Sequence, residues 1–258
     1  MVMSAQSKAA KRPKAKQRAY AKPPILEAMV EFRFSEPLPS RVVERVSKRL
    51  GKGYDTVNAE KEVTFGFDVL KGAAEITSES PRFRHASDDQ VDIFVARSGS
   101  LIWSRLAPYE GWESFSLRLR REATTAFSLT GPKKLARIGM RYINRIDVPT
   151  DPDSGLCRYE DYIAINLELP SLMDPLSAYS WHIERTFSDS GLKAMMRSAT
   201  LIPEIPGTVA FLLDIDVAMV MDIPLKIEEV LDNLEPMRAL KNSLFECAIT
   251  DRARKAFN

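Results

Sequence analysis

The sequence of 258 residues is poor in the residues that form disulfides, metal sites and membrane spans. It contains two cysteines, Cys157 and Cys247, which lie far apart, and two histidines, His85 and His182. Such scattered ligands argue against a disulfide framework and a zinc site, so we expect free thiols and no bound metal. No apolar run reaches the ~18 residues that a membrane-spanning helix needs, so we expect no membrane partner.

Signals for catalysis and for secretion are also missing. The chain has neither a Gly-rich phosphate loop nor a G-x-S-x-G nucleophile elbow, so we expect no cofactor and lean against an enzyme. Residues 19–24 interrupt the apolar stretch that a secretory signal requires after its basic region, which predicts a cytoplasmic protein. With 45% hydrophobic and 28% charged residues, the composition is that of a globular chain.

Positive charge is concentrated at the N-terminus, where residues 1–22 contain no acidic residue. The chain as a whole has 37 basic and 35 acidic residues, so the remainder carries 30 and 35 and has a net charge of −5. We predict a flexible basic arm over residues 1–22, followed by an acidic body. The arm is either a solvated tail or a segment that contacts nucleic-acid phosphates or an acidic partner. Its basic residues are Lys8, Lys11, Arg12, Lys14, Lys16, Arg18 and Lys22.

Apolar periodicity divides the rest of the chain into strands and helices. Strands are predicted at 25–34, within 62–106, and at 137–148, 179–187, 195–202 and 209–221; helices are predicted at 40–51, 110–130 and from 225 onwards. This order predicts an α+β fold in which antiparallel sheets are covered by long helices. A Pro- and Asp-rich stretch at 148–155 suggests two pseudo-related halves, 23–148 and 149–258, although one continuous domain is the alternative.

Three arginines in the predicted strand 137–148 share one face, because side chains alternate along a strand. They are Arg137, Arg141 and Arg145, and we add Arg33 and Tyr142 as nearby candidates. Guanidinium groups bind carboxylates and phosphates in a bidentate manner, so the row is a candidate site for an anionic ligand or an acidic partner. Cross-strand salt bridges on a solvent-facing sheet are the alternative interpretation.

Asp214 and Asp216 form a carboxylate pair on one face of another predicted strand. Paired carboxylates can bind Mg²⁺ or act as acid and base, but simple alternation of an exposed strand also explains them. A metal cluster with His182 and Glu184 is conceivable, although no local spacing supports it. If the two aspartates face the arginine row, we expect them to be its counterions.

Four segments together resemble a sporadically distributed family of prokaryotic proteins of unknown function and similar length. The resemblance lies in YAKPPILEAMVEFRF at 20–34, YEGWESF at 109–115, RIGMRYINRI at 137–146 and FECAITDRARKAF at 245–257. It covers the chain from about residue 20 to its end and implies no catalytic residues. The patchy distribution of the family implies an accessory role in bacterial defence or toxin neutralisation.

The sequence therefore favours a non-catalytic protein that binds another protein through its sheet face. A binder of an anionic small molecule or nucleotide, using the arginine row, is one alternative. A nucleic-acid-associated accessory protein, using the basic arm, is another.

Overall fold

The structure, a computed structural model, describes residues 18–68, 73–151, 153, 155, 157–165, 172 and 176–258, except for the side chains of 63–68 and 73–78. Five basic residues of the predicted arm therefore lie outside the described residues, namely Lys8, Lys11, Arg12, Lys14 and Lys16. Arg18 lies within them and is exposed.

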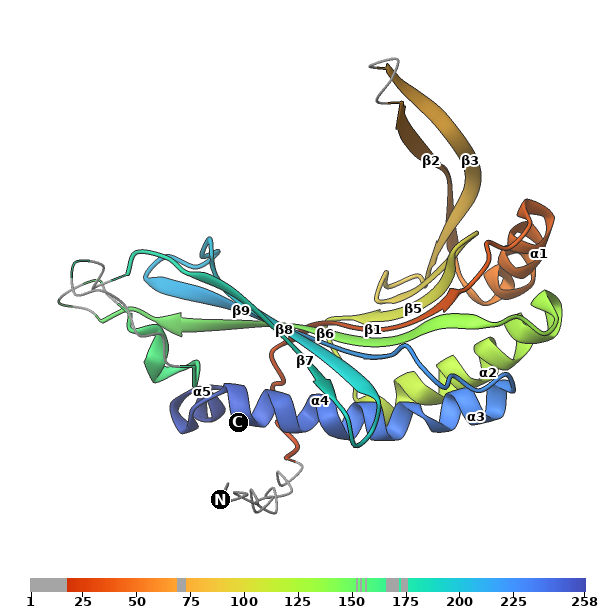
Figure 1. Ribbon diagram of the computed structural model, residues 1–258. Helices are drawn as coiled ribbons and strands as arrows, with labels where there is room; N and C mark the ends of the chain where they lie inside the picture. The colour runs from red at the N-terminus through yellow and green to blue at the C-terminus, as the bar shows by residue number, and fades with distance from the viewer. Residues whose placement is uncertain are drawn as a thin grey trace, which may run out of the picture.

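The described strands form one open antiparallel sheet of nine strands in the order β2-β3-β4-β5-β1-β6-β9-β8-β7 (Figure 1). Strands β1 and β6 are central, and β2 and β7 are the two edges. The strands are β1 (Ile25–Phe34), β2 (Thr56–Asp68), β3 (Ala73–Ala86), β4 (Asp92–Arg97), β5 (Ser100–Leu106), β6 (Leu135–Pro149), β7 (Ser180–Phe187), β8 (Leu192–Leu201) and β9 (Thr208–Met219).

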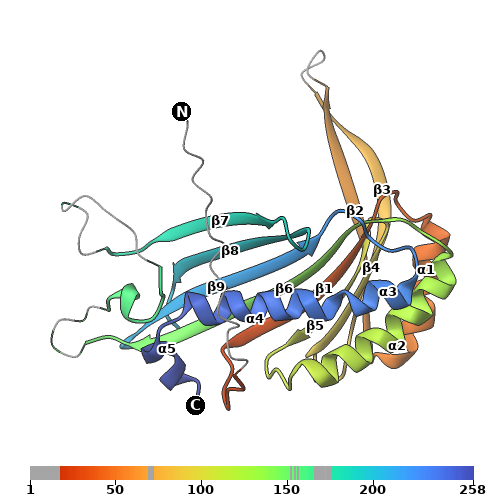
Figure 2. The same cartoon turned by 60° about the horizontal axis from the view of Figure 1, so that its bottom comes forward.

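All labelled helices lie on one side of this sheet, and α2 and α4 run across it (Figures 1 and 2). The helices are α1 (Ser40–Leu50), α2 (Trp112–Thr130), α3 (Ile227–Asp232), α4 (Leu234–Ala248) and α5 (Asp251–Ala256), with short 3₁₀ turns at Gly51–Gly53 and Tyr159–Asp161. No helix in the described ranges has the length and apolar character needed to cross a membrane.

These elements make the protein an α+β protein, as predicted. The structure does not support two pseudo-related halves: residues 23–148 supply six strands and residues 149–258 supply three, all in one sheet. Strand β6 pairs with β9 from Ile138↔Met219 to Pro149↔Thr208, directly across the expected boundary. Nor are the covering helices long, because they range from 6 to 19 residues and average proteins have helices of about 11–12.

The hydrophobic core lies between the sheet and its helices and draws on both parts of the chain. Phe32, Phe94 and Trp103 are fully buried there. The charged residue Glu122 of α2 is also buried. It accepts hydrogen bonds from Trp103 Nε1 at 3.1 Å and from Tyr54 Oη at 2.8 Å, and these bonds compensate for its loss of hydration.

Two helices begin in different ways. Ser40 is the first residue of α1, and Pro39 precedes it without a side-chain cap. Proline fixes its φ near the value that a chain needs to enter a helix, so the entry does not require a hydroxyl cap. Thr250 caps α5, because its Oγ1 accepts a hydrogen bond from Ala253 N.

The segment before β1 is anchored to the C-terminal helices. The ring of Tyr20 contacts Phe257 and Phe245 at centroid distances of 5.4 and 6.2 Å, and its hydroxyl donates to Glu246. Lys22 N donates to the carbonyl of Phe257 at 2.8 Å. Residues 20–22, which the sequence assigned to the basic arm, are therefore part of the folded body.

Candidate functional site

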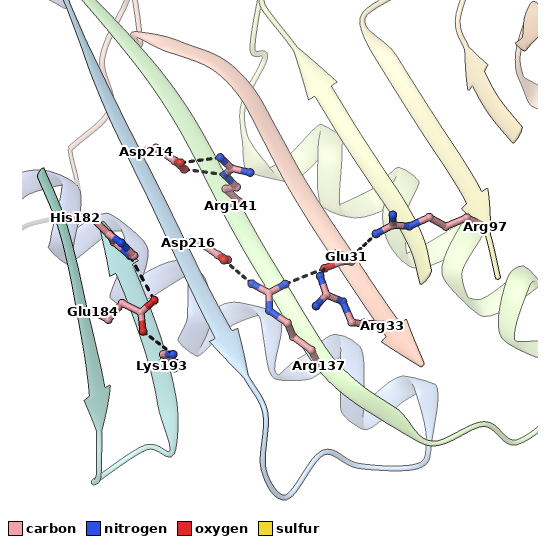
Figure 3. A network of polar contacts seen from close by, with 10 residues as sticks. All are labelled: Glu31, Arg33, Arg97, Arg137, Arg141, His182, Glu184, Lys193, Asp214 and Asp216. Atoms are coloured by element: carbon pink, nitrogen blue, oxygen red, sulfur yellow. Dashed lines mark hydrogen bonds and ion pairs between the residues drawn. The ribbon is translucent and has the colours of Figure 1, made fainter. Parts of the chain in front are cut away.

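Arg137 and Arg141 of the predicted arginine row lie on the side of the sheet opposite the helices (Figure 3). Alternation along β6 directs Arg137 and Arg141 to this side, while Ile138 and Met140 are fully buried on the helix side. We call this side the open face and define it by Glu31, Arg33, Arg97, Arg137, Arg141, Asp214 and Asp216. Tyr142, predicted near the row, lies on the helix side and is almost completely buried.

Glu31 is the centre of a charge network on the open face. Its carboxylate contacts Arg33 at 3.0 Å, Arg97 at 3.2 Å and Arg137 at 3.0 Å (Figure 3). Burial alone would raise the pKa of this carboxyl, but the guanidinium groups of Arg33 and Arg137 and a hydrogen bond from Ser100 outweigh it and hold the pKa below its usual value. Glu31 is therefore a charged residue that joins β1, β4 and β6.

The two aspartates of β9 complete this network, so the prediction that they are counterions of the row is confirmed. Arg137 contacts Asp216 at 2.5 Å, and Arg141 binds Asp214 through two hydrogen bonds of 2.8 and 2.7 Å. Burial raises the pKa of Asp216, because it outweighs the attraction to Arg137, and the charge of Asp214 adds to the increase.

Arg145 belongs to a separate group at the far end of β6. Its Nε contacts Asp147 at 3.0 Å, and its Nη1 contacts Glu204 at 2.8 Å. All three arginines of the row thus bind carboxylates of the protein itself. The pairs of Arg137 and Arg141 are the cross-strand salt bridges that were the alternative to a ligand site, and a small anion would have to displace these partners.

In two ion pairs of the open face the carboxylate lies inside and the guanidinium group outside. The side chain of Arg33 is 51% exposed and that of its partner Glu31 is 9% exposed. In the second pair, Arg141 is 37% exposed and Asp214 is 2% exposed. In these two pairs the guanidinium group therefore contacts solvent more than its carboxylate does, although the network contains both signs.

Gly139 gives Arg137 room to reach both carboxylates. Gly139 lies directly opposite Glu31 in the β1–β6 register, and the guanidinium group of Arg137 lies over it. A Cβ atom built on Gly139 would overlap that guanidinium group. The glycine of the RIGMRYINRI segment is therefore explained by side-chain packing on the open face.

We expect Gly139→Ala to lower the free energy of unfolding by about 1–3 kcal/mol, because Arg137 must leave Glu31 and Asp216. Urea denaturation measures the loss. In an Arg137→Met background the same substitution is expected to have little effect, which is the non-additivity of coupled residues. Equal losses in the two backgrounds would show that the glycine is required for another reason.

The conceivable metal cluster is not assembled. His182 contacts Glu184 at 3.3 Å, and Glu184 contacts Lys193 at 2.6 Å, all on the edge strand β7 and its neighbour β8 (Figure 3). Figure 3 shows this group apart from Asp214 and Asp216. The described part of the chain contains no group of three His, Cys, Asp or Glu side chains placed to hold a metal ion.

A pocket on the helix side was not predicted from the sequence. It has a volume of about 450 Å³ and lies between residues 18–25, the loop at 109–112, β6 and α4. The hydroxyl groups of Tyr109 and Tyr142 are 2.9 Å apart at the pocket. The ammonium group of Lys241 lies 3.8 Å from the ring centroid of Tyr142.

Lys241 is the unusual residue of this pocket. It is 8% exposed, and burial lowers its pKa to about 7. The structure gives its ammonium group no hydrogen bond or ion pair among the described residues; its contact is with the ring of Tyr142. The sequence did contain a signal, because Lys241 follows the apolar Met237 by four positions and so shares its side of α4.

Two comparisons with known proteins add no relative. No protein-family model matches this chain, and no curated protein matches it either.

Proposed function

We propose that this protein is a non-catalytic interaction protein whose open face binds an acidic surface of a partner protein. The observation that carries the proposal is the layering of charge, with exposed guanidinium groups of Arg33 and Arg141 above the buried carboxylates of Glu31 and Asp214. The buried carboxylates hold the guanidinium groups in place and leave part of each one in contact with solvent. Charge complementarity of this kind selects a partner and accelerates its association.

The shape of the sheet supports the same proposal. Strands β2 and β3 form a hairpin that leaves the sheet on the side opposite the helices (Figure 1). An ion pair between Glu60 and Arg82 links the two strands of this hairpin. A partner on the open face would meet the sheet below and the hairpin at one side, which gives a larger contact area than a flat sheet provides.

A protein partner is favoured over nucleic acid by the charge of the body. Outside residues 1–22 the chain has a net charge of −5, which repels a polyanion over distances of about a Debye length. The patch of exposed arginine is local and has carboxylates beneath it, which suits a partner surface of limited size. Binding of nucleic acid through Arg18 and the rest of the arm is the competing proposal.

A small anion on the arginine row is a weaker proposal. Arg137 donates one hydrogen bond to Glu31 and one to Asp216. Arg141 donates to both carboxylate oxygens of Asp214, through Nε and Nη2. A small ligand would have to replace these intramolecular partners, whereas a large acidic surface only needs the exposed edges of the groups.

We also propose that the chain belongs to the sporadically distributed prokaryotic family that it resembles, with an accessory role in defence or toxin neutralisation. Contacts between the resembling segments support this proposal. Glu31 of the first segment binds Arg137 of the third, and Tyr20 of the first packs on Phe245 and Phe257 of the last. Motif residues that meet in this way have a shared structural task.

Capture from native cell extract tests the proposed partner. Three baits are compared: the full chain, a chain that starts at Ala19, and the full chain with Arg33→Ser and Arg197→Ser. Arg197 is exposed on β8 and lies opposite Asp214 in the β8–β9 register. We expect a stoichiometric acidic protein with the first two baits and about tenfold less with the third, as the loss of ~1.4 kcal/mol implies.

The same experiment distinguishes the alternatives. If only nucleic acid is recovered, and only when residues 1–18 are present, the basic arm is the binding element and the proposal fails. An exposed-lysine variant on the helix side, Lys226→Ser, is the matched control and is expected to retain the partner in full.

A further inference from the structure

The pocket beside α4 is a candidate ligand site that is independent of the open face, because it lies on the helix side of the sheet. We propose that this pocket binds a small organic anion whose carboxylate or phosphate group contacts Lys241 and whose flat apolar body lies against the aromatic wall. Volume, charge and wall chemistry carry the proposal.

The volume of about 450 Å³ is that of a small-molecule site, since such pockets typically measure about 300–1,000 Å³. Residues far apart in the sequence enclose it, which is common for binding pockets. Tyr20 and Pro24 come from the N-terminal segment, Trp112 from the start of α2, and Phe245 from α4. A pocket built from such distant segments depends on the complete fold.

The charges around the pocket leave Lys241 without compensation. Glu246 is already bound by Tyr20 and by Arg254, the latter at 3.1 Å. Glu110 forms an ion pair of 3.0 Å with Arg105.

Arg238 has a carboxylate of its own, because it contacts Glu235 at 3.3 Å. Arg18, at the edge of the pocket, is exposed and adds positive charge without burial. Lys241 is therefore a buried cation that forms no ion pair among the described residues. Arg238 repels it and Glu246 attracts it, but Glu246 is bound to Tyr20 and Arg254, so a ligand anion would supply a direct partner.

The contact with Tyr142 leaves the ammonium group of Lys241 able to bind an anion. A lysine ammonium has three N–H donors, and the ring occupies one side of it by a cation–π interaction. The remaining donors can serve a carboxylate or phosphate oxygen. The hydroxyl group of Tyr109, 2.9 Å from that of Tyr142, is a further polar group at the same place.

Aromatic side chains account for the second part of the ligand. The rings of Trp112, Tyr109 and Phe245 line the pocket. Stacking of a flat apolar group on such rings stabilises a complex. Arg238 lies 5.7 Å from the centroid of Trp112, which limits the movement of that ring. A compact inorganic anion would use Lys241 but leave the rings without a partner, so an organic anion fits better.

Trp112 gives a direct readout, because a ligand at the pocket changes its fluorescence. We would titrate the full chain with benzoate, phenyl phosphate and the neutral isostere benzamide, and follow both fluorescence and melting temperature. We expect benzoate or phenyl phosphate to bind saturably and at least tenfold more tightly than benzamide. Comparison of the two anions shows which head group the site prefers, and either result supports the proposal.

Substitution of Lys241 is the decisive part of this experiment. Lys241→Met is expected to remove the preference for the anion, whereas Lys241→Arg is expected to retain part of it. The control is Lys255→Met, at an exposed position of α5, which should bind like the wild type. Circular dichroism verifies that each variant is folded.

Three results would overturn the proposal. They are equal affinity for benzoate and benzamide, unchanged anion binding by Lys241→Met, and no saturable binding of either anion. None of these results bears on the protein partner of the open face, so the two proposals fail separately.

Discussion

Replacing Glu31 by glutamine is expected to lower the free energy of unfolding by about 3–5 kcal/mol, the cost of removing one partner from a buried ion pair. The reason is that Glu31 forms ion pairs with Arg33, Arg97 and Arg137 at once. Glutamine keeps the size of the side chain but leaves three guanidinium groups close together with less negative charge. Urea denaturation at neutral pH measures the effect.

Glu27→Gln is the matched control, because Glu27 lies on the same side of β1 and forms no ion pair among the described residues. We expect a change below about 1 kcal/mol there. Similar losses for the two variants would contradict a special role for Glu31.

The effect of Glu31 should also depend on pH. Its pKa is lower in the folded protein than the usual value near 4.3 in an unfolded chain. Protons therefore bind the unfolded state more tightly, and the stabilisation by Glu31 is complete well above pH ~4.3 and decreases as the pH falls through the folded pKa. The difference between wild type and Glu31→Gln should become smaller in acid.

Replacing Lys241 by methionine is expected to stabilise the protein by about 2–4 kcal/mol at pH 6, in the absence of a ligand. At that pH the ammonium group is charged, buried and without a carboxylate partner. Methionine is similar in length and apolar, so it fills the same space without a charge to desolvate. Thermal and urea unfolding measure the gain.

The gain should disappear at high pH. Burial lowers the pKa of Lys241 to about 7, whereas the unfolded chain keeps a value near 10.4. Between these values unfolding takes up a proton, so the stability of the wild type rises with pH relative to Lys241→Met. A gain that is constant from pH 6 to pH 10 would mean that Lys241 is not desolvated in the folded protein.

Local patterns predicted the elements of the fold better than their arrangement. Alternation defined β1 at 25–34, and it placed Asp214 and Asp216 on one side of β9. Nothing local specifies which strands pair, so the single sheet and the direct contact of β6 with β9 could not be derived. Strand β3 lies within the predicted stretch 62–106, but its own bounds were not predicted, because its sequence at 73–86 is mostly polar.

The same limit explains which site residues were found. Arg137 and Arg141 were recognised from their spacing within one strand, and their carboxylates from spacing within another. The pocket depends on a helix that crosses the sheet, so that Lys241 of α4 meets Tyr142 of β6. A lysine on an apolar helix stripe has many explanations, and only the fold shows what it faces.

Site-specific photocross-linking most directly tests whether an acidic partner protein binds through the open face. Benzoylphenylalanine would replace Met195, which is on the open face opposite Asp216, or Leu117, which is 66% exposed on α2. Irradiation in native extract should cross-link one acidic protein to position 195 and no protein to position 117. The cross-link should map to an Asp- and Glu-rich segment of the partner. Cross-links to position 117 alone, or equal yields at both positions, would contradict binding through the open face.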